Sequence, residues 1–141
     1  MRKISLNLFD GRHDLPVQKS IFKGALKDVT NTKAIEDLAR TSLQLIAHSL
    51  GIEEELTIAS DYGSDEVVFD FPRNAEVTIY VTGLTVALIA VLNVLRSYDA
   101  KVILAHYDKA INDYYFQEVR WLLGGKKMKK DDYIKLISSN S

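Results

Sequence analysis

Residues 77–106 read VTIYVTGLTVALIAVLNVLRSYDAKVILAH, and the order of residue types in this stretch decides the fold. The first residues, up to Thr82, are mostly β-branched or aromatic, with polar side chains interleaved, as in a strand. Gly83 breaks the pattern, residues 86–98 have the composition of a helix, and residues 102–106 form a second apolar run. Such runs are typical of buried parallel strands joined by a helix. The stretch therefore predicts a strand–turn–helix–strand unit.

Residues 77–95 carry no charge, and about 18 such residues are enough to span a bilayer. The strand-like start and the break at Gly83 argue against a membrane helix. Residues 1–9 lack the long apolar core of a signal peptide, and the chain has no cysteine, which suits a reducing compartment and excludes disulfides and thiolate zinc sites. We expect a cytoplasmic protein with no membrane partner.

The chain has 141 residues, of which 47% are hydrophobic, and its formal net charge is -1. This size and composition predict one packed α/β domain over residues 1–123, followed by a basic C-terminal tail over 124–141 that can dock as a short helix. A charge so near zero gives no field that would attract duplex nucleic acid.

Other patterns place further elements around the central unit. We expect a strand over residues 4–8, a helical turn over 21–26, a helix from Thr32 to Leu50 that Thr32 caps and Gly51 ends, strands over 56–59 and 67–71, and a last antiparallel strand over 114–121. Together they predict a Rossmann-like, mostly parallel sheet with flanking helices and a C-terminal β-hairpin.

Ligands of open parallel sheets bind beyond the carboxyl ends of the strands. Here that rule selects three candidate segments, which are Asp10–Asp14, Thr82–Thr85 and His106–Asp108. We expect the three segments to meet at one edge of the sheet.

The turn Thr82-Gly83-Leu84-Thr85 combines a glycine, two hydroxyls and the free N–H groups of a helix start, which together favour phosphate or carboxylate. The alternative is that Gly83 makes the turn and Thr85 only caps the helix. The turn has neither the three glycines of a dinucleotide fingerprint nor the lysine of a triphosphate loop.

The segment Arg12-His13-Asp14, which follows Asp10, mixes acid, base and cation. His13 has an ordinary pKa near 6.5, suited to proton transfer, and Arg12 can hold a phosphate. The alternative is a solvated loop in which Asp14 pairs with Arg12 or His13.

His106 and Asp108 are expected at the rim of the same cleft, with the alternative that they only end a strand. The three histidines, His13, His48 and His106, have no recognised metal-ligand spacing, so we expect no metal and no other cofactor.

Five aromatic residues gather in the last hairpin, and they fit either a buried core or a surface that stacks on a base or forms a dimer: Tyr107, Tyr114, Tyr115, Phe116 and Trp121. Because a hairpin at a sheet edge leaves an edge strand or an aromatic surface to cover, we expect a homodimer.

The Arg12-His13 loop after a strand, the pattern of residues 77–90 and the strand ending at His106 resemble small Rossmann-like CRISPR-accessory proteins that include ring nucleases. The chain is also similar to uncharacterised phage and mobile-element proteins of Gram-positive bacteria. The first resemblance implies a nucleotide-binding protein of antiviral defence or counter-defence, whose ligand is a cyclic oligonucleotide such as cyclic oligoadenylate or another phosphate-bearing small molecule.

If such a protein cleaves its ligand, the resemblance implies a metal-independent ring nuclease, which is a phosphodiesterase. A ribose 2′-hydroxyl would attack the neighbouring phosphate, His13 would assist proton transfer, and Arg12 with the amides of residues 83–85 would stabilise the developing charge.

The alternative function is a noncatalytic protein–protein interaction module, such as an inhibitor or assembly factor, that uses the aromatic hairpin and the basic tail. The two functions predict different structures. An open polar cleft at Gly83 favours the nucleotide-binding protein, whereas a filled cleft with a large exposed patch on the hairpin favours the interaction module.

Overall fold

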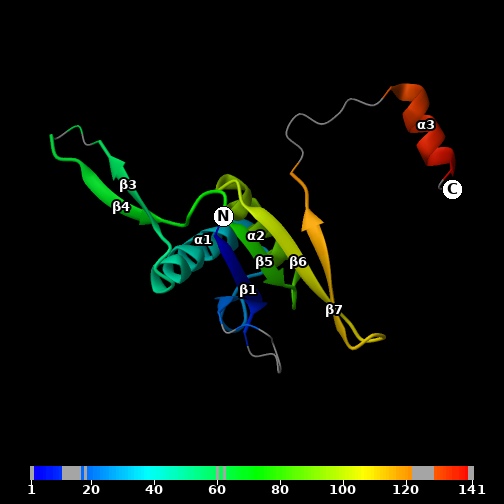
Figure 1. Cartoon of the computed structure of the whole chain (residues 1–141), viewed down its shortest axis with the longest axis horizontal. Helices are drawn as coiled ribbons and strands as arrows, with labels where there is room; N and C mark the ends of the chain where they lie inside the picture. The colour runs from blue at the N-terminus through cyan, green and yellow to red at the C-terminus, as the bar shows by residue number, and fades with distance from the viewer. Residues whose placement is uncertain are drawn as a thin grey trace.

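A computed structural model describes residues 2–10, 17, 19–59, 61, 63–121 and 129–139. Its elements are β1 (Lys3–Phe9), β2 (Ser20–Phe22), α1 (Thr32–Ser49), β3 (Glu54–Ile58), β4 (Glu66–Asp70), β5 (Glu76–Tyr80), α2 (Thr85–Ser97), β6 (Lys101–Asp108), β7 (Asp113–Val119) and α3 (Lys130–Ser139) (Figure 1). Among the described residues, five strands form one sheet in the order β2-β1-β5-β6-β7, and β3 and β4 form a second, two-stranded sheet. The predicted α/β class, with a mostly parallel sheet and a C-terminal hairpin, is confirmed.

The unit that decides the fold lies at the centre of this sheet. β5 and β6 run parallel, with Val77 opposite Val102, and α2 connects them. Gly83 makes the turn into α2 with a φ of 90°, a conformation that L side chains rarely adopt. Residues 77–95 are thus strand, turn and helix, and no helix in the described ranges has both the length and the apolarity to cross a membrane.

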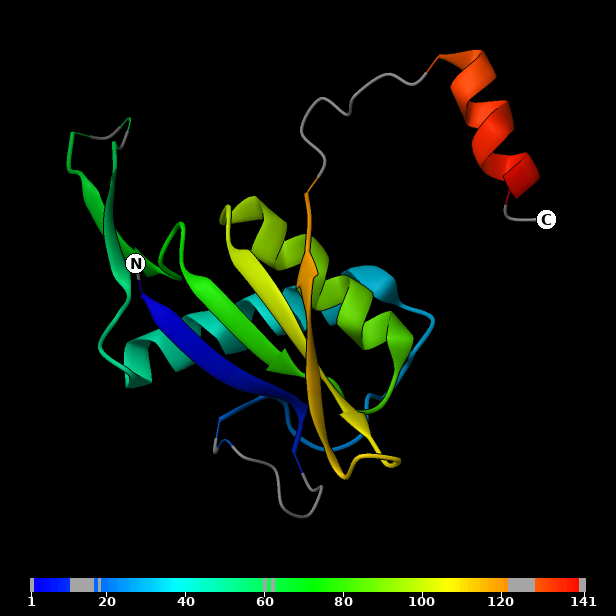
Figure 2. The ribbon, with the colours of Figure 1, turned by 45° about the vertical axis from the view of Figure 1, so that its right-hand side comes forward.

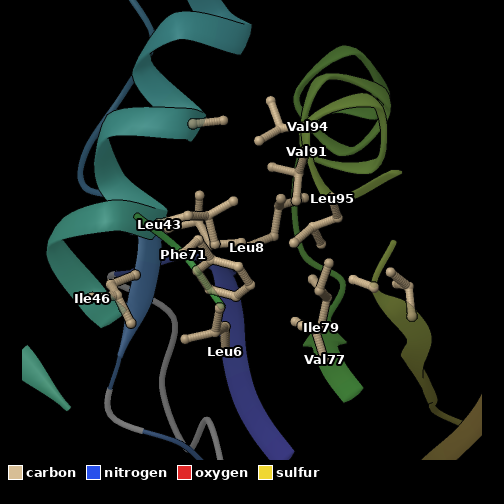
Figure 3. Packing of buried hydrophobic residues seen from close by; sticks show 14 of the residues in the cluster. Leu6, Leu8, Leu43, Ile46, Phe71, Val77, Ile79, Val91, Val94 and Leu95 are labelled. Atoms are coloured by element: carbon tan, nitrogen blue, oxygen red, sulfur yellow. The ribbon is translucent and has the colours of Figure 1, made fainter. Parts of the chain in front are cut away.

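The core lies between the sheet and the two long helices, which pack side by side over the same sheet face (Figures 2 and 3). Alternation along β1 sends Leu6 and Leu8 into this layer, where Leu43 of α1 and Val91 of α2 meet them. Burying each such side chain stabilises the fold by about 1.5–3 kcal/mol. The sheet is therefore held from one side.

The opposite face of the sheet has no described helix over it (Figure 2). Thr78 and Tyr80 of β5 share this face with Ile103 of β6 and Phe116 of β7, as the strand register requires. Phe116 is exposed and the other three are half-buried. The fold therefore leaves one sheet face open within the described part of the chain.

Two local expectations are wrong. Ser20–Phe22 form the parallel edge strand β2 rather than a helical turn, because Asn7 donates its backbone N–H to the Lys19 carbonyl (2.8 Å) and its side-chain amide to the Val17 carbonyl (2.8 Å). The cap of α1 is Asn31, whose side-chain oxygen accepts the Ala34 N–H (3.1 Å), and not Thr32. Asn and Thr are both good caps, so the sequence alone does not separate them.

β3 and β4 form a hairpin that projects from the body of the protein, and we call it the arm (Figures 1 and 2). Its base is fixed by Asp70, which accepts hydrogen bonds from Tyr98 Oη (2.6 Å) and Gln44 Nε2 (3.1 Å). Burial raises the pKa of Asp70, but these bonds, the Phe71 N–H and the Arg40 charge outweigh it and lower the pKa below the ordinary value. The arm base therefore loses stability as the pH falls through that lowered pKa.

The C-terminal tail contains α3, which stands apart from the sheet in both views (Figures 1 and 2). Its apolar side chains Ile134, Leu136 and Ile137 are each about half exposed. An isolated helix of this length is marginal in water, so packing elsewhere would have to stabilise it.

Candidate functional site

The carboxyl ends of β1, β5 and β6 meet at one edge of the sheet, as the sequence predicts. Asn7 lies opposite Tyr80, and Tyr80 lies opposite Ala105, so the residues that follow each strand share that edge. Asp10, Thr82–Thr85 and His106–Asp108 are brought there. Arg12, His13 and Asp14 lie outside the described residues.

Phe9 fills the space beside Gly83. A Cβ atom on Gly83 would lie 3.0 Å from Cδ2 and 3.2 Å from Cε2 of the Phe9 ring, which also packs on Phe22 with 5.2 Å between ring centroids. The glycine that can admit a ligand is thus closed on this side by an aromatic ring.

The start of α2 nevertheless keeps free polar groups. The helix is capped by Leu84 without a side-chain hydrogen bond, so Thr85 is its first residue and not its cap. Gly83, Leu84 and Thr85 are all exposed. The Thr82 hydroxyl is buried and has no hydrogen-bond partner among the described residues. Such a helix start favours an anion.

The acidic candidates at this edge accept backbone hydrogen bonds. An Asp10 carboxylate oxygen accepts the Gly24 N–H (2.9 Å), and an Asp108 oxygen accepts the Ala110 N–H (2.9 Å) in the β6–β7 turn. His106 bonds through Nε2 to Gln117 Oε1 (3.0 Å) and stacks on Tyr115. These contacts give all three residues a structural role.

No group of three or more potential metal ligands occurs within the described ranges. His48, at the end of α1, is exposed, and its Nδ1 atom lies 3.2 Å from Oε1 of Glu53. It lies in α1, away from the carboxyl ends of the strands.

Four aromatic residues form an aromatic face, made of Tyr80 at the end of β5 and Tyr107, Tyr114 and Phe116 of the β6–β7 hairpin. Tyr114 contacts Tyr80 and Tyr107 edge to face, with ring centroids 5.0 and 5.4 Å apart. Burial and then the two neighbouring phenols raise the pKa of Tyr114 above its ordinary value. Tyr107 is 48% and Phe116 61% exposed.

These exposures decide between the two interpretations of the hairpin aromatics. The core interpretation is wrong for Tyr107, Tyr115 and Phe116, because these side chains are 48%, 51% and 61% exposed. It holds better for Trp121, which is half-buried and donates its indole N–H to the Ala100 carbonyl (2.7 Å).

A groove runs between α1 and the residues that lead from β2 to the start of α1. It was not predicted from the sequence. Its two parts have volumes of about 600 and 300 Å³ and share Phe22, Lys23 and Leu38. Lys19, Lys23 and Lys27 line it at intervals of four residues. That spacing is the one sequence signal that could have found it, although the apolar wall comes from α1, distant in the chain.

Comparison of the chain with family models, curated proteins and solved structures found no match.

Proposed function

We propose that this protein is a noncatalytic interaction module, an inhibitor or assembly factor, whose partner is a protein that covers the aromatic face. The observation that carries the proposal is the exposure of Tyr107 and Phe116 on a sheet face with no described helix over it. Exposed clusters of large aromatic residues are typical of protein interfaces, since each ring buries a large area at little cost in side-chain entropy.

The surroundings of Gly83 support the same choice. The Phe9 ring occupies the space beside the glycine, and Asp10, His106 and Asp108 are engaged in local hydrogen bonds. A catalytic cleft needs polar groups that converge on open space. The described part of this edge offers few of them.

A photo-crosslinking residue at position 116 tests this proposal. In cells of the source organism, we expect position 116 to give one dominant protein adduct, and the same residue at Arg96, an exposed position on α2, to give none. Phe116→Ser in a chain crosslinked through position 107 should remove most of the adduct, because loss of a central aromatic residue typically weakens an interface by about 2 kcal/mol or more. Equal crosslinking from positions 116 and 96 would contradict the proposal.

A second candidate function is binding of a cyclic oligoadenylate or another phosphate-bearing molecule at the carboxyl edge. The observations in its favour are the exposed start of α2 and the unpartnered, buried hydroxyl of Thr82. If the protein also cleaves this ligand, His13 and Arg12 are the proposed catalytic residues.

Incubation with cyclic tetra- and hexa-adenylate, with and without chelator, tests the second function. If it is right, Thr82→Val and His13→Ala should separate binding from chemistry. Thr82→Val would weaken binding about tenfold, the value of one hydrogen bond to a charged group, while His13→Ala would lower only the rate, by about 10²–10⁴-fold. Neither change should lower the melting temperature much, and absence of both binding and product would exclude this function.

A further inference from the structure

The arm carries both acidic side chains and exposed apolar side chains. From Ile52 to Pro72 the chain has seven acidic residues and no basic one. Phe69 and Val67 lie on one face of the hairpin, Leu56 and Ile58 on the other, and all four are exposed, Phe69 by 56%. An isolated two-stranded hairpin is at best marginally stable in water, so a surface that covers it is expected.

The groove along α1 has exposed apolar side chains and a row of lysines, which complement the apolar and acidic side chains of the arm. Leu38 and Leu45, two turns apart on α1, are 50% and 64% exposed, and both line the groove. Lys19, Lys23 and Lys27 supply positive charge along the opposite wall, and no salt bridge involves them within the described ranges.

Two carboxylates also line the groove, and each accepts hydrogen bonds from residues beside it. Asp10 accepts the Gly24 N–H (2.9 Å), and Asp28 accepts the N–H and the hydroxyl of Thr30 (2.9 and 2.6 Å). These bonds come from neutral donors and leave both carboxylates charged, so the groove lining carries three ammonium groups against two carboxylates and positive charge is in excess.

We propose that the arm of one molecule docks in the α1–β2 groove of a second copy of this chain, and that the reciprocal contact closes a two-fold dimer. The face of the hairpin that carries Phe69 would enter the groove. Glu55, which lies opposite Phe69 on that face, would lie against the groove lysines, while Phe69 covers Leu38 and Leu45. The chain's own arm does not fill this groove, because Gln44, Tyr98 and Arg73 fix its base and it points away from the body (Figures 1 and 2). The proposal is independent of the aromatic face and of the proposed function.

A charge exchange between two variants tests this contact. One variant carries Glu55→Lys in the arm, and the other carries Lys23→Glu in the groove. Both side chains are exposed, so both variants should fold, which circular dichroism verifies. We expect the unmodified protein to have twice the 15.9 kDa chain mass in sedimentation at micromolar concentration.

Each variant alone opposes like charges in both contacts, so its dimer dissociation constant should rise about 100-fold and its mass fall to that of the monomer. Mixing the two variants restores opposite charges in both contacts and should restore the dimer, and added salt should weaken it. The single change Arg96→Glu, outside the arm and the groove, is the matched control and should leave the dimer unchanged. A monomeric unmodified protein, a variant that stays dimeric alone, or a mixture that stays monomeric would each overturn the proposal.

Discussion

Replacing Phe71 by alanine should cost about 3–5 kcal/mol of the free energy of unfolding, the largest loss expected for any single truncation discussed for this chain. Phe71 follows the arm and is fully buried in the core (Figure 3). Its ring lies 5.4 Å from the Tyr98 ring. The loss combines the transfer of the ring to water with the cavity it leaves. Since small domains are stable by only about 5–15 kcal/mol, the variant should be close to unfolding at 37 °C.

Urea denaturation followed by circular dichroism measures this effect, and Phe116→Ala is its matched control. Phe116 is the same residue type but 61% exposed, so the control should change the free energy of unfolding by only about 0.5 kcal/mol. Similar losses at the two positions would show that the packing described around Phe71 is wrong.

Gly83→Val should destabilise the protein by about 2–4 kcal/mol for two separate reasons. The φ of 90° strains any L side chain, and the new Cβ would lie 3.0 Å from the Phe9 ring, so that the ring must move. The measurement is again the free energy of unfolding in urea.

Gly51→Val separates the two causes. Gly51 also has a positive φ, 68°, but a Cβ there would meet nothing within 4 Å, so the control should cost only the backbone strain, about 1–2 kcal/mol. The excess at Gly83 should shrink when Phe9→Ala is combined with Gly83→Val, as a double-mutant cycle measures. If the excess is the same with and without the Phe9 ring, the contact is not its cause.

The sequence predicts the parts of the fold in which residue pattern and environment agree. The unit from β5 to β6 is such a part, because its strands are buried by α2 and its helix follows a required glycine. β2 was not predicted because three residues are too few to show an alternating pattern. Its pairing also depends on Asn7 of β1, which lies outside the stretch of sequence around β2. Likewise, within the described ranges β3 pairs with β4 and not with the central sheet, and the local sequence pattern does not specify with which strand a given strand pairs.

The sequence predicted where the candidate site lies better than it predicted which contacts the site residues make. Parallel register alone brings Asp10, Thr82 and Asp108 to one edge, so topology was enough to place them. The ring of Phe9 over Gly83 and the local bonds of His106 are tertiary contacts, and they change what those residues can do. The groove escaped prediction for the same reason, since Leu45 and Lys19 become neighbours only when α1 packs beside β2.

The position of β1 in the sheet has a consequence for synthesis of the chain. β1 lies between β2 and β5, and its partner across the centre of the sheet, with Ile4 opposite Val77, is more than seventy residues later in the sequence. On the ribosome, the apolar side of β1 must therefore wait until β5 has emerged before the middle of the sheet can form. Non-local pairing of this kind slows folding and exposes apolar strands to aggregation. We therefore expect the nascent chain to be the stage at which this protein is most prone to aggregation.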